Sequence, residues 1–120
     1  MRRRGTTDPN LIALLHHLRK ASNQYKARIW GAVAEYLSKT RSRRIAVNIS
    51  RINRYTREGD VVVVPGKVLG AGVIDHSVTV AALAFSKQAR EKIVTAKGKC
   101  LSILELIELN PRGSNVKIIG

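Results

Sequence analysis

The run Val61-Val62-Val63-Val64 decides the fold class of this chain, because a run of consecutive valines with no polar member is typical of a strand buried on both faces. Further β-branched runs lie at residues 45–49, 67–69 and 78–85. Residues that favour turns separate these runs, at Asp60, Pro65-Gly66, Gly70-Ala71-Gly72 and Asp75-His76. The second part of the chain is therefore predicted to contain several short strands.

Three serines follow strand-like segments, each at the start of a short helical segment. They are Ser50, Ser86 and Ser102, and Ser102 has Glu105 at the spacing of a capping box. Gly98 is expected to end the helix that follows Ser86. Repeated strand-to-helix units of this kind predict a small, irregular, wound α/β core.

Two helices are predicted before this core. Asp8 caps the first and Pro9 takes its first position, and apolar residues then recur at helical spacing until residues 22–23. The second helix is expected over residues 27–37, with Trp30 facing inward. A chain of 120 residues has the size of one domain. We divide it into a basic arm (1–7), a helical region (8–38), a basic loop (39–44) and an α/β core (45–120).

The excess of positive charge is the strongest indication of function. The chain contains 22 Lys and Arg against 8 Asp and Glu, which gives a formal net charge of +14. Repulsion of this size destabilises a compact fold unless a polyanion neutralises it, and nucleic acid, an anionic membrane and an acidic protein are the candidates. Nucleic acid is favoured, because neutralising its phosphates releases counterions. Residues 1–60 carry most of the cations and are expected to face the RNA.

The candidate RNA-binding residues are basic side chains that cluster along the chain. Arginine is prominent among them, and its planar guanidinium grips phosphate with two hydrogen bonds. The set comprises Arg2, Arg3 and Arg4 in the arm; Arg19, Lys20, Lys26 and Arg28 around the helix junction; Arg41, Arg43 and Arg44 in the loop; Arg51, Arg54 and Arg57 at intervals of three; and Lys67 and Lys87. Tyr25, Tyr36 and Tyr55 could stack on bases, but they form no paired aromatic motif, so contacts with RNA shape and backbone are expected more than base contacts.

No combination of residues suited to catalysis is evident. Asp75, His76 and Ser77 are the residue types of a catalytic triad, but neighbours in an extended segment are expected to point apart, so we interpret them as a polar turn. Val68 follows Lys67 where a nucleotide-binding P-loop requires Ser or Thr. Asp75 also stands in place of the third glycine of a dinucleotide fingerprint. We therefore predict no enzymatic activity and no cofactor.

Metal and membrane sites are not indicated either. His16 and His17 diverge on a helix, and further donors at zinc-ligand spacing are lacking. Cys100 is the single cysteine, which excludes an internal disulfide, fits a reducing cytoplasm and is interpreted as a buried structural residue. No signal peptide and no apolar run of about 20 residues are evident, so a soluble protein is expected.

Several segments together resemble a known family. They are the runs over residues 66–72, 78–82 and 85–93, the opening Thr7-Asp8-Pro9-Asn10-Leu11 and the block Val47-Asn48-Ile49-Ser50-Arg51-Ile52. In this combination the chain resembles large-subunit ribosomal protein eighteen of archaea and eukaryotes, a family related to bacterial large-subunit protein fifteen. The sequence departs from it at Lys97-Gly98-Lys99, where relatives often carry consecutive glycines.

The resemblance implies N-terminal helices followed by a small, irregular, strand-strand-helix wound core. It also implies a structural, non-enzymatic role in the large subunit of cytoplasmic ribosomes, with ribosomal RNA and neighbouring ribosomal proteins as partners and neither a membrane nor a small-molecule substrate. A sequence-neutral DNA-packaging protein is the alternative that shares the high positive charge, and a small RNA-modifying enzyme is a third hypothesis.

Overall fold

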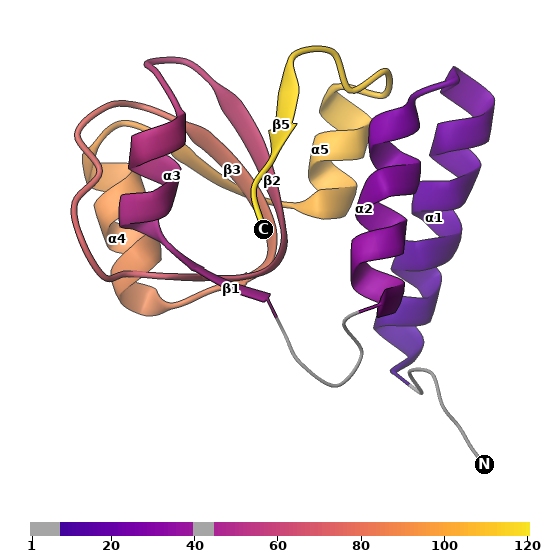
Figure 1. Ribbon diagram of the computed structural model, residues 1–120, viewed down its shortest axis with the longest axis horizontal. Coiled ribbons are helices and arrows are strands. Elements are labelled where there is room, and N and C mark those ends of the chain that lie inside the picture. Colours follow the sequence, from indigo (N-terminus) through magenta and orange to yellow (C-terminus); the bar gives the residue numbers. More distant parts are fainter. Residues whose placement is uncertain (1–7, 40–44) are drawn as a thin grey trace.

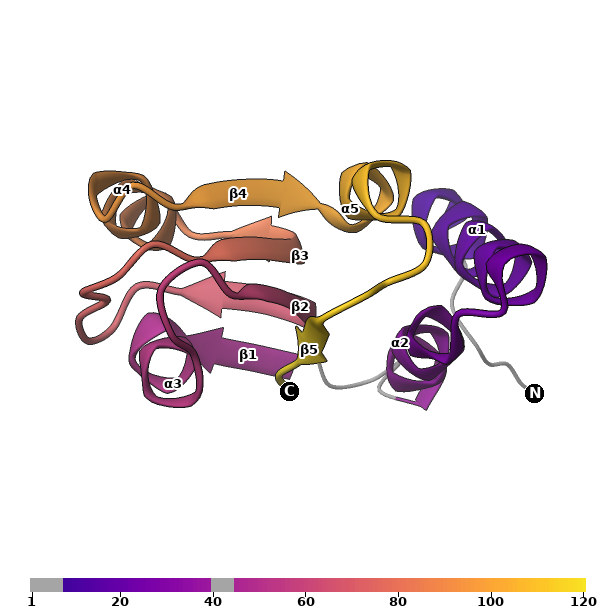
Figure 2. The same cartoon turned by 90° about the horizontal axis from the view of Figure 1, so that it is seen from above.

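The computed structural model describes residues 8–39 and 45–120 and shows an α/β protein with two helices before a sheet (Figures 1 and 2). The elements are α1 (Pro9–Tyr25), α2 (Arg28–Lys39), β1 (Ile45–Asn48), α3 (Ile49–Tyr55), β2 (Val61–Leu69), β3 (Thr79–Phe85), α4 (Lys87–Thr95), β4 (Lys99–Ser102), α5 (Ile103–Leu109) and β5 (Val116–Ile118). The succession β2, β3, α4 is a strand-strand-helix unit. The predicted fold class is confirmed.

Strand β2 is the centre of a parallel sheet with the order β1-β2-β3-β4, and β5 joins it as an additional partner of β2. β5 and β1 share one edge of β2. β5 pairs with its first half, where Val62 faces Lys117, and β1 pairs with its second half, where Val47 faces Val68. The C-terminal segment and the β1–α3 unit therefore lie on the same side of the central strand.

Helices cover both faces of the sheet, which explains the four valines. Val63 packs into one core cluster with α1, α2 and α5, whereas Val62 and Val64 pack into the other with α3 and α4. Figure 1 shows the same division, with α1, α2 and α5 together on one side and α3 and α4 on the other. Because alternate residues of a strand point to opposite faces, a strand between two helical layers needs apolar residues at both.

The turn predicted at Pro65-Gly66 is wrong, since both residues lie inside the continuous strand β2. The pairing with β3 shifts register between Val64 and Lys67. Such a bulge interrupts the hydrogen-bond ladder, so a proline, which has no N–H to donate, is accepted there. At Gly66 a Cβ atom would collide with the carbonyl oxygen of Ile45 in β1. The glycine is thus needed for the close approach of two strands.

Two of the three predicted serine caps are confirmed. Ser86 Oγ accepts a hydrogen bond from the Ala89 N–H at 3.1 Å, and Ser102 and Glu105 form the capping box at 3.1 and 2.7 Å. The cap predicted at Ser50 is wrong. Asn48 occupies that N-cap position, and its side-chain oxygen accepts from the Ala71 N–H at 3.3 Å, so it binds a neighbouring loop instead of its own helix.

The helix ends also differ from the predictions. The cap predicted at the start of α1 is confirmed. The helix continues beyond residues 22–23 to Tyr25, and its C-cap residue Lys26 adopts a left-handed conformation with φ 53°. Helix α4 ends at Thr95 with Ala96, not Gly98, as its C-cap residue, and the left-handed residue that follows is Lys97 with φ 68°. Gly98 is required for another reason, because a Cβ atom would collide with the carbonyl oxygen of Val78.

Candidate nucleic-acid interface

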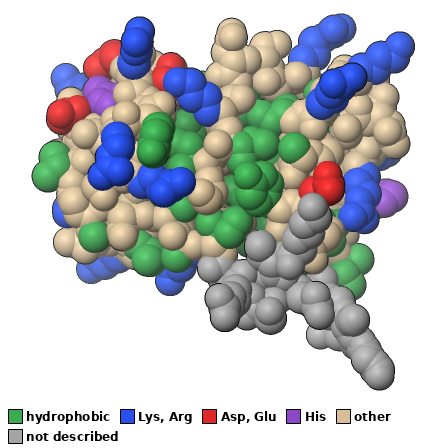
Figure 3. Space-filling view, in the orientation of Figure 1, with side chains coloured by type: hydrophobic (Ala, Val, Ile, Leu, Met, Phe, Trp, Pro, Cys, Tyr) green, Lys and Arg blue, Asp and Glu red, His purple; other side chains and the backbone are tan. Residues whose placement is uncertain are grey.

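Helix α3 carries the best-defined group of predicted RNA-binding residues. Arg51 and Arg54 lie exposed on it, three residues apart, whereas Arg57 lies beyond its end at Tyr55. The guanidinium carbon of Arg51 lies 5.6 Å from the centre of the Tyr55 ring, a cation–π contact that holds the side chain over the aromatic face. Figure 3 shows Lys and Arg side chains on this part of the surface.

The four cations predicted at the helix junction are separated by the structure. Lys26 and Arg28 lie at the junction itself, and both are exposed. Arg19 instead donates a hydrogen bond to Ser38 Oγ at 3.2 Å, near the far end of α2. Lys20 is exposed on α1 beside the hollow between α1 and α5.

The remaining predicted residues lie elsewhere. Lys67 is the exposed residue of β2, and Lys87 is the exposed first residue of α4. Six predicted cations lie outside the described residues: Arg2, Arg3, Arg4, Arg41, Arg43 and Arg44.

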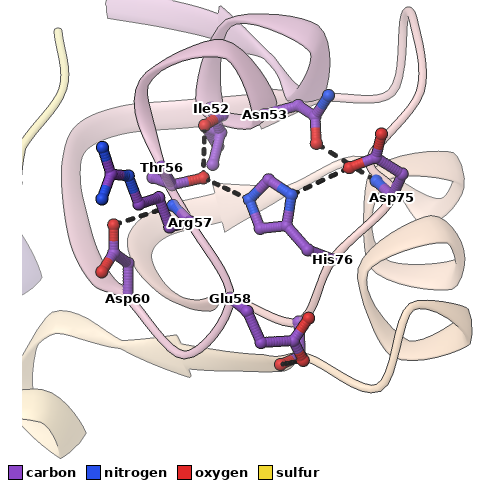
Figure 4. A network of polar contacts seen from close by, with 9 residues as sticks. Ile52, Asn53, Thr56, Arg57, Glu58, Asp60, Asp75 and His76 are labelled. Atoms are coloured by element: carbon purple, nitrogen blue, oxygen red, sulfur yellow. Dashed lines mark hydrogen bonds and ion pairs between the residues drawn. The ribbon is translucent and has the colours of Figure 1, made fainter.

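A network of polar contacts joins the end of α3 to the segment before β3 (Figure 4). Thr56, which is buried, donates its hydroxyl to the Ile52 carbonyl and contacts His76 Nε2, both at 2.7 Å. His76 Nδ1 lies 2.9 Å from Asp75 Oδ1, and the Asp75 N–H donates to Asn53 Oδ1 at 3.1 Å. These contacts fasten α3 and its arginines to the core.

The network corrects one prediction and explains why it is not catalytic. The side chains of Asp75 and His76 meet, although neighbours in an extended segment were expected to point apart, because the backbone bends at His76. The hydroxyl in line with them belongs to Thr56, not to Ser77, which donates to Glu58 Oε2 at 2.7 Å. Since the Thr56 hydroxyl is buried and already donates to a helix carbonyl, it has no free proton to give up as a nucleophile.

Two lysines that were absent from the predicted set bind oxygen atoms of nearby loops within the protein. Lys92 Nζ donates to the carbonyl oxygens of Gly70 and Gly72 at 2.9 and 2.8 Å. Lys117 Nζ forms an ion pair with Asp60 Oδ2 at 2.9 Å and also reaches the Tyr55 carbonyl at 3.4 Å. Sequence spacing gave no signal for either role, because the partners lie 20 or more residues away.

Two side chains have perturbed acidity. The pKa of Asp60 lies below its ordinary value of 3.8, first because the Arg57 N–H donates to the carboxylate and then because Lys117 binds it. Burial raises the pKa of the Cys100 thiol, against a smaller opposing effect of Arg90. Cys100 is partly buried and packs against the cluster of α3 and α4.

The described residues form no group of three potential metal ligands, and none of their helices is long and apolar enough to cross a bilayer. An α/β core with exposed Lys and Arg on several elements places the chain in the class of small basic proteins with a surface suited to a polyanion.

The comparisons identify the family. The model of the family "Ribosomal protein 60S L18 and 50S L18e" matches residues 2–120. A protein of Methanothermobacter thermautotrophicus named "Large ribosomal subunit protein eL18" is 52% identical over 113 residues, which cover 94% of this chain and 93% of the relative. The protein of the same name from Methanospirillum hungatei is 46% identical over 118 residues, 98% of each chain. The chain belongs to this family of ribosomal proteins, and this membership confirms that it is not an enzyme.

Proposed function

We propose that this protein is a structural constituent of the large ribosomal subunit that binds ribosomal RNA through Arg and Lys contacts with phosphates. The observation that carries the proposal is a family match over residues 2–120 combined with a net charge of +14. The relatives' name places them in the large subunit, which in archaea is cytoplasmic. A DNA-packaging role receives no support from this family.

In the proposed mechanism, Lys and Arg side chains on a rigid protein core attract the phosphates of the RNA electrostatically. Each phosphate that a cation neutralises releases counterions, and the core sets the distances between the cations, so RNA segments that fit are held in one arrangement. Helix α3 supports this mechanism best, because the Thr56–His76–Asp75 network anchors the element that carries Arg51 and Arg54.

The proposed contact residues are the predicted cations, inside and outside the described residues. They are Arg2, Arg3, Arg4, Arg19, Lys20, Lys26, Arg28, Arg41, Arg43, Arg44, Arg51, Arg54, Arg57, Lys67 and Lys87. We further propose that the chain is one domain with the division given above, that it contacts neighbouring ribosomal proteins, and that its family is related to bacterial large-subunit protein fifteen. Superposition of the β1–α5 core on that bacterial protein tests the last point.

Binding to purified large-subunit RNA at several salt concentrations tests the function. With about six to ten phosphate contacts, affinity is expected to fall roughly 10³- to 10⁵-fold between 50 and 200 mM salt for duplex-like charge density. Duplex DNA of the same length is the matched competitor. A flat salt dependence, a preference for the DNA, or absence of the protein from purified large subunits would each contradict the proposal.

A further inference from the structure

A groove on the surface brings together two tyrosines and two cations from three separate parts of the chain. Tyr36 comes from α2, Arg51 and Tyr55 from α3, and Lys117 from β5, and the groove extends to Gly120. Figure 1 shows the C-terminus between α3 and α2, and Figure 3 shows hydrophobic side chains over the centre of this face with Lys and Arg to either side. The mixture of flat, apolar and cationic surfaces points to a particular ligand.

The aromatic side chains of the groove are partly exposed to solvent. Tyr55 is 53% exposed and Tyr36 is 41% exposed, although both rings line a hollow. Gly120 lies close to the Tyr36 ring, because an added Cβ would be 3.3 Å from the ring carbon Cε1. Gly120 therefore forms one wall of the groove. The hollow has a volume of about 480 Å³.

The charges of the groove differ in availability. Lys117 is paired with Asp60, so its charge is partly neutralised within the protein. Among the residues that the structure describes, no carboxylate pairs with Arg51, whose guanidinium lies against the Tyr55 ring. A guanidinium held in this way presents a planar face for stacking and N–H groups for a phosphate.

We propose that this groove binds one unstacked nucleotide of an RNA strand, with its base against Tyr55, Tyr36 or the Arg51 plane and its phosphate at Arg51. The proposal rests on the proposed function for the identity of the polymer and adds a base-contacting site to it. It also gives one place for the few base contacts that the sequence led us to expect, because stacking on aromatic rings and guanidinium planes is how unpaired RNA bases are held.

Ultraviolet crosslinking of intact large subunits is the first test. We expect mass spectrometry of the digested subunits to find a nucleotide attached to the peptide that contains Tyr55 or Tyr36. A protein crosslink at these tyrosines in place of RNA would overturn the proposal and assign the groove to a neighbouring protein. Crosslinks to RNA confined to other peptides would also overturn it, while leaving the proposed function intact.

Titration of the full chain with a fluorescent octauridine and with an abasic octamer of equal charge is the second test. The wild type is expected to bind the octauridine about 5- to 150-fold more tightly, the range for stacking one base. Tyr55→Ala should remove this preference and Tyr55→Phe should keep it. Tyr25→Ala is the matched control, because Tyr25 is an exposed tyrosine that lines a different hollow. Equal binding of both oligomers by the wild type, or an undiminished preference in Tyr55→Ala, would overturn the proposal.

Arg51→Lys separates stacking from charge. This variant keeps the positive charge but loses the planar guanidinium, so the preference for bases should fall while the salt dependence stays unchanged. Arg90→Lys is the matched control, because Arg90 also lies over an aromatic ring, 5.1 Å from the centre of Phe85, and is not among the proposed contact residues; it should leave the preference intact. If Arg51→Lys and Arg90→Lys behave alike, Arg51 is no part of a base site. Should Tyr55→Ala fail to fold, Arg51→Lys and the crosslinks decide the question.

Discussion

Lys92→Met is the most informative single substitution, because it separates a cation that supports the fold from one that meets RNA. Methionine keeps the apolar stem of the side chain but removes the ammonium group. The two hydrogen bonds at 2.9 and 2.8 Å to the carbonyls of Gly70 and Gly72 are then lost. These bonds hold the segment that links β2 to β3, a parallel pair joined without a helix.

The expected loss of stability follows from these two bonds. Hydrogen bonds from charged groups contribute about 1.5–3 kcal/mol each when shielded, and solvent screening reduces this where the groups are partly exposed. One of the two bonds is part-buried and the other is exposed. We therefore expect Lys92→Met to lower the free energy of unfolding by about 1–2 kcal/mol in total. For a domain of this size, Tm should fall by roughly 3–10 °C.

Lys87→Met in the same helix is the matched control. Lys87 is exposed at the N-terminal end of α4, where a positive charge opposes the helix dipole, so Tm should stay constant or rise slightly. If Lys87 binds a phosphate, its loss should reduce the slope of log affinity against log salt by about 0.7–0.9. Lys92→Met should leave that slope unchanged.

Calorimetry and salt titrations of both variants against large-subunit RNA provide the measurements. The reasoning is refuted if Lys92→Met melts at the wild-type temperature but loses one unit of salt slope. In that case Lys92 would act on RNA rather than on the loop carbonyls.

Three further predictions concern stability and reactivity. The native pKa of Asp60 is lowered, so its carboxylate stabilises the fold above the ordinary pKa of 3.8 and loses this effect as pH falls through the native value. In urea unfolding, the difference in free energy of unfolding between wild type and Asp60→Asn should therefore disappear below about pH 4. Alkylation of Cys100 by iodoacetamide at pH 8 should be slower in the native protein than in urea, since burial raises the thiol pKa; equal rates would contradict this burial. Ser102→Ala should lower the free energy of unfolding by about 0.5–2 kcal/mol, whereas an unchanged Tm would mean that the capping box is unimportant.

Local signals in the sequence succeeded where the partners lie a few residues apart. The cap at Asp8, the capping box of Ser102 and Glu105, and the buried strand at Val62–Val64 were all predicted, because short-range hydrogen bonds and periodic burial leave direct traces in the order of residues. The cap at Ser50 was wrong, because α3 already begins at Ile49 and Asn48 is its N-cap residue, with a side chain that accepts from a loop more than 20 residues later.

The candidate interface shows the same limit. Its cationic residues were evident from composition, but no local pattern indicated that Lys92 and Lys117 bind carbonyl and carboxylate oxygens within the protein. The meeting of Asp75 and His76 with Thr56 was likewise missed, because a bend in the backbone turns neighbouring side chains together and a residue 20 positions earlier completes the contact.

The sequence by itself determined the fold class, the family and the need for a polyanion, because these follow from local pattern and from total charge. Only the tertiary structure decided which cations are exposed without an intramolecular partner and which aromatic residues line the same groove. The physical reason is the strand pairing of β2. Along one edge of this strand, β5 pairs with the first half and β1 pairs with the second half. That shared edge brings Lys117 within reach of Tyr55 and so creates the groove that no linear spacing could reveal.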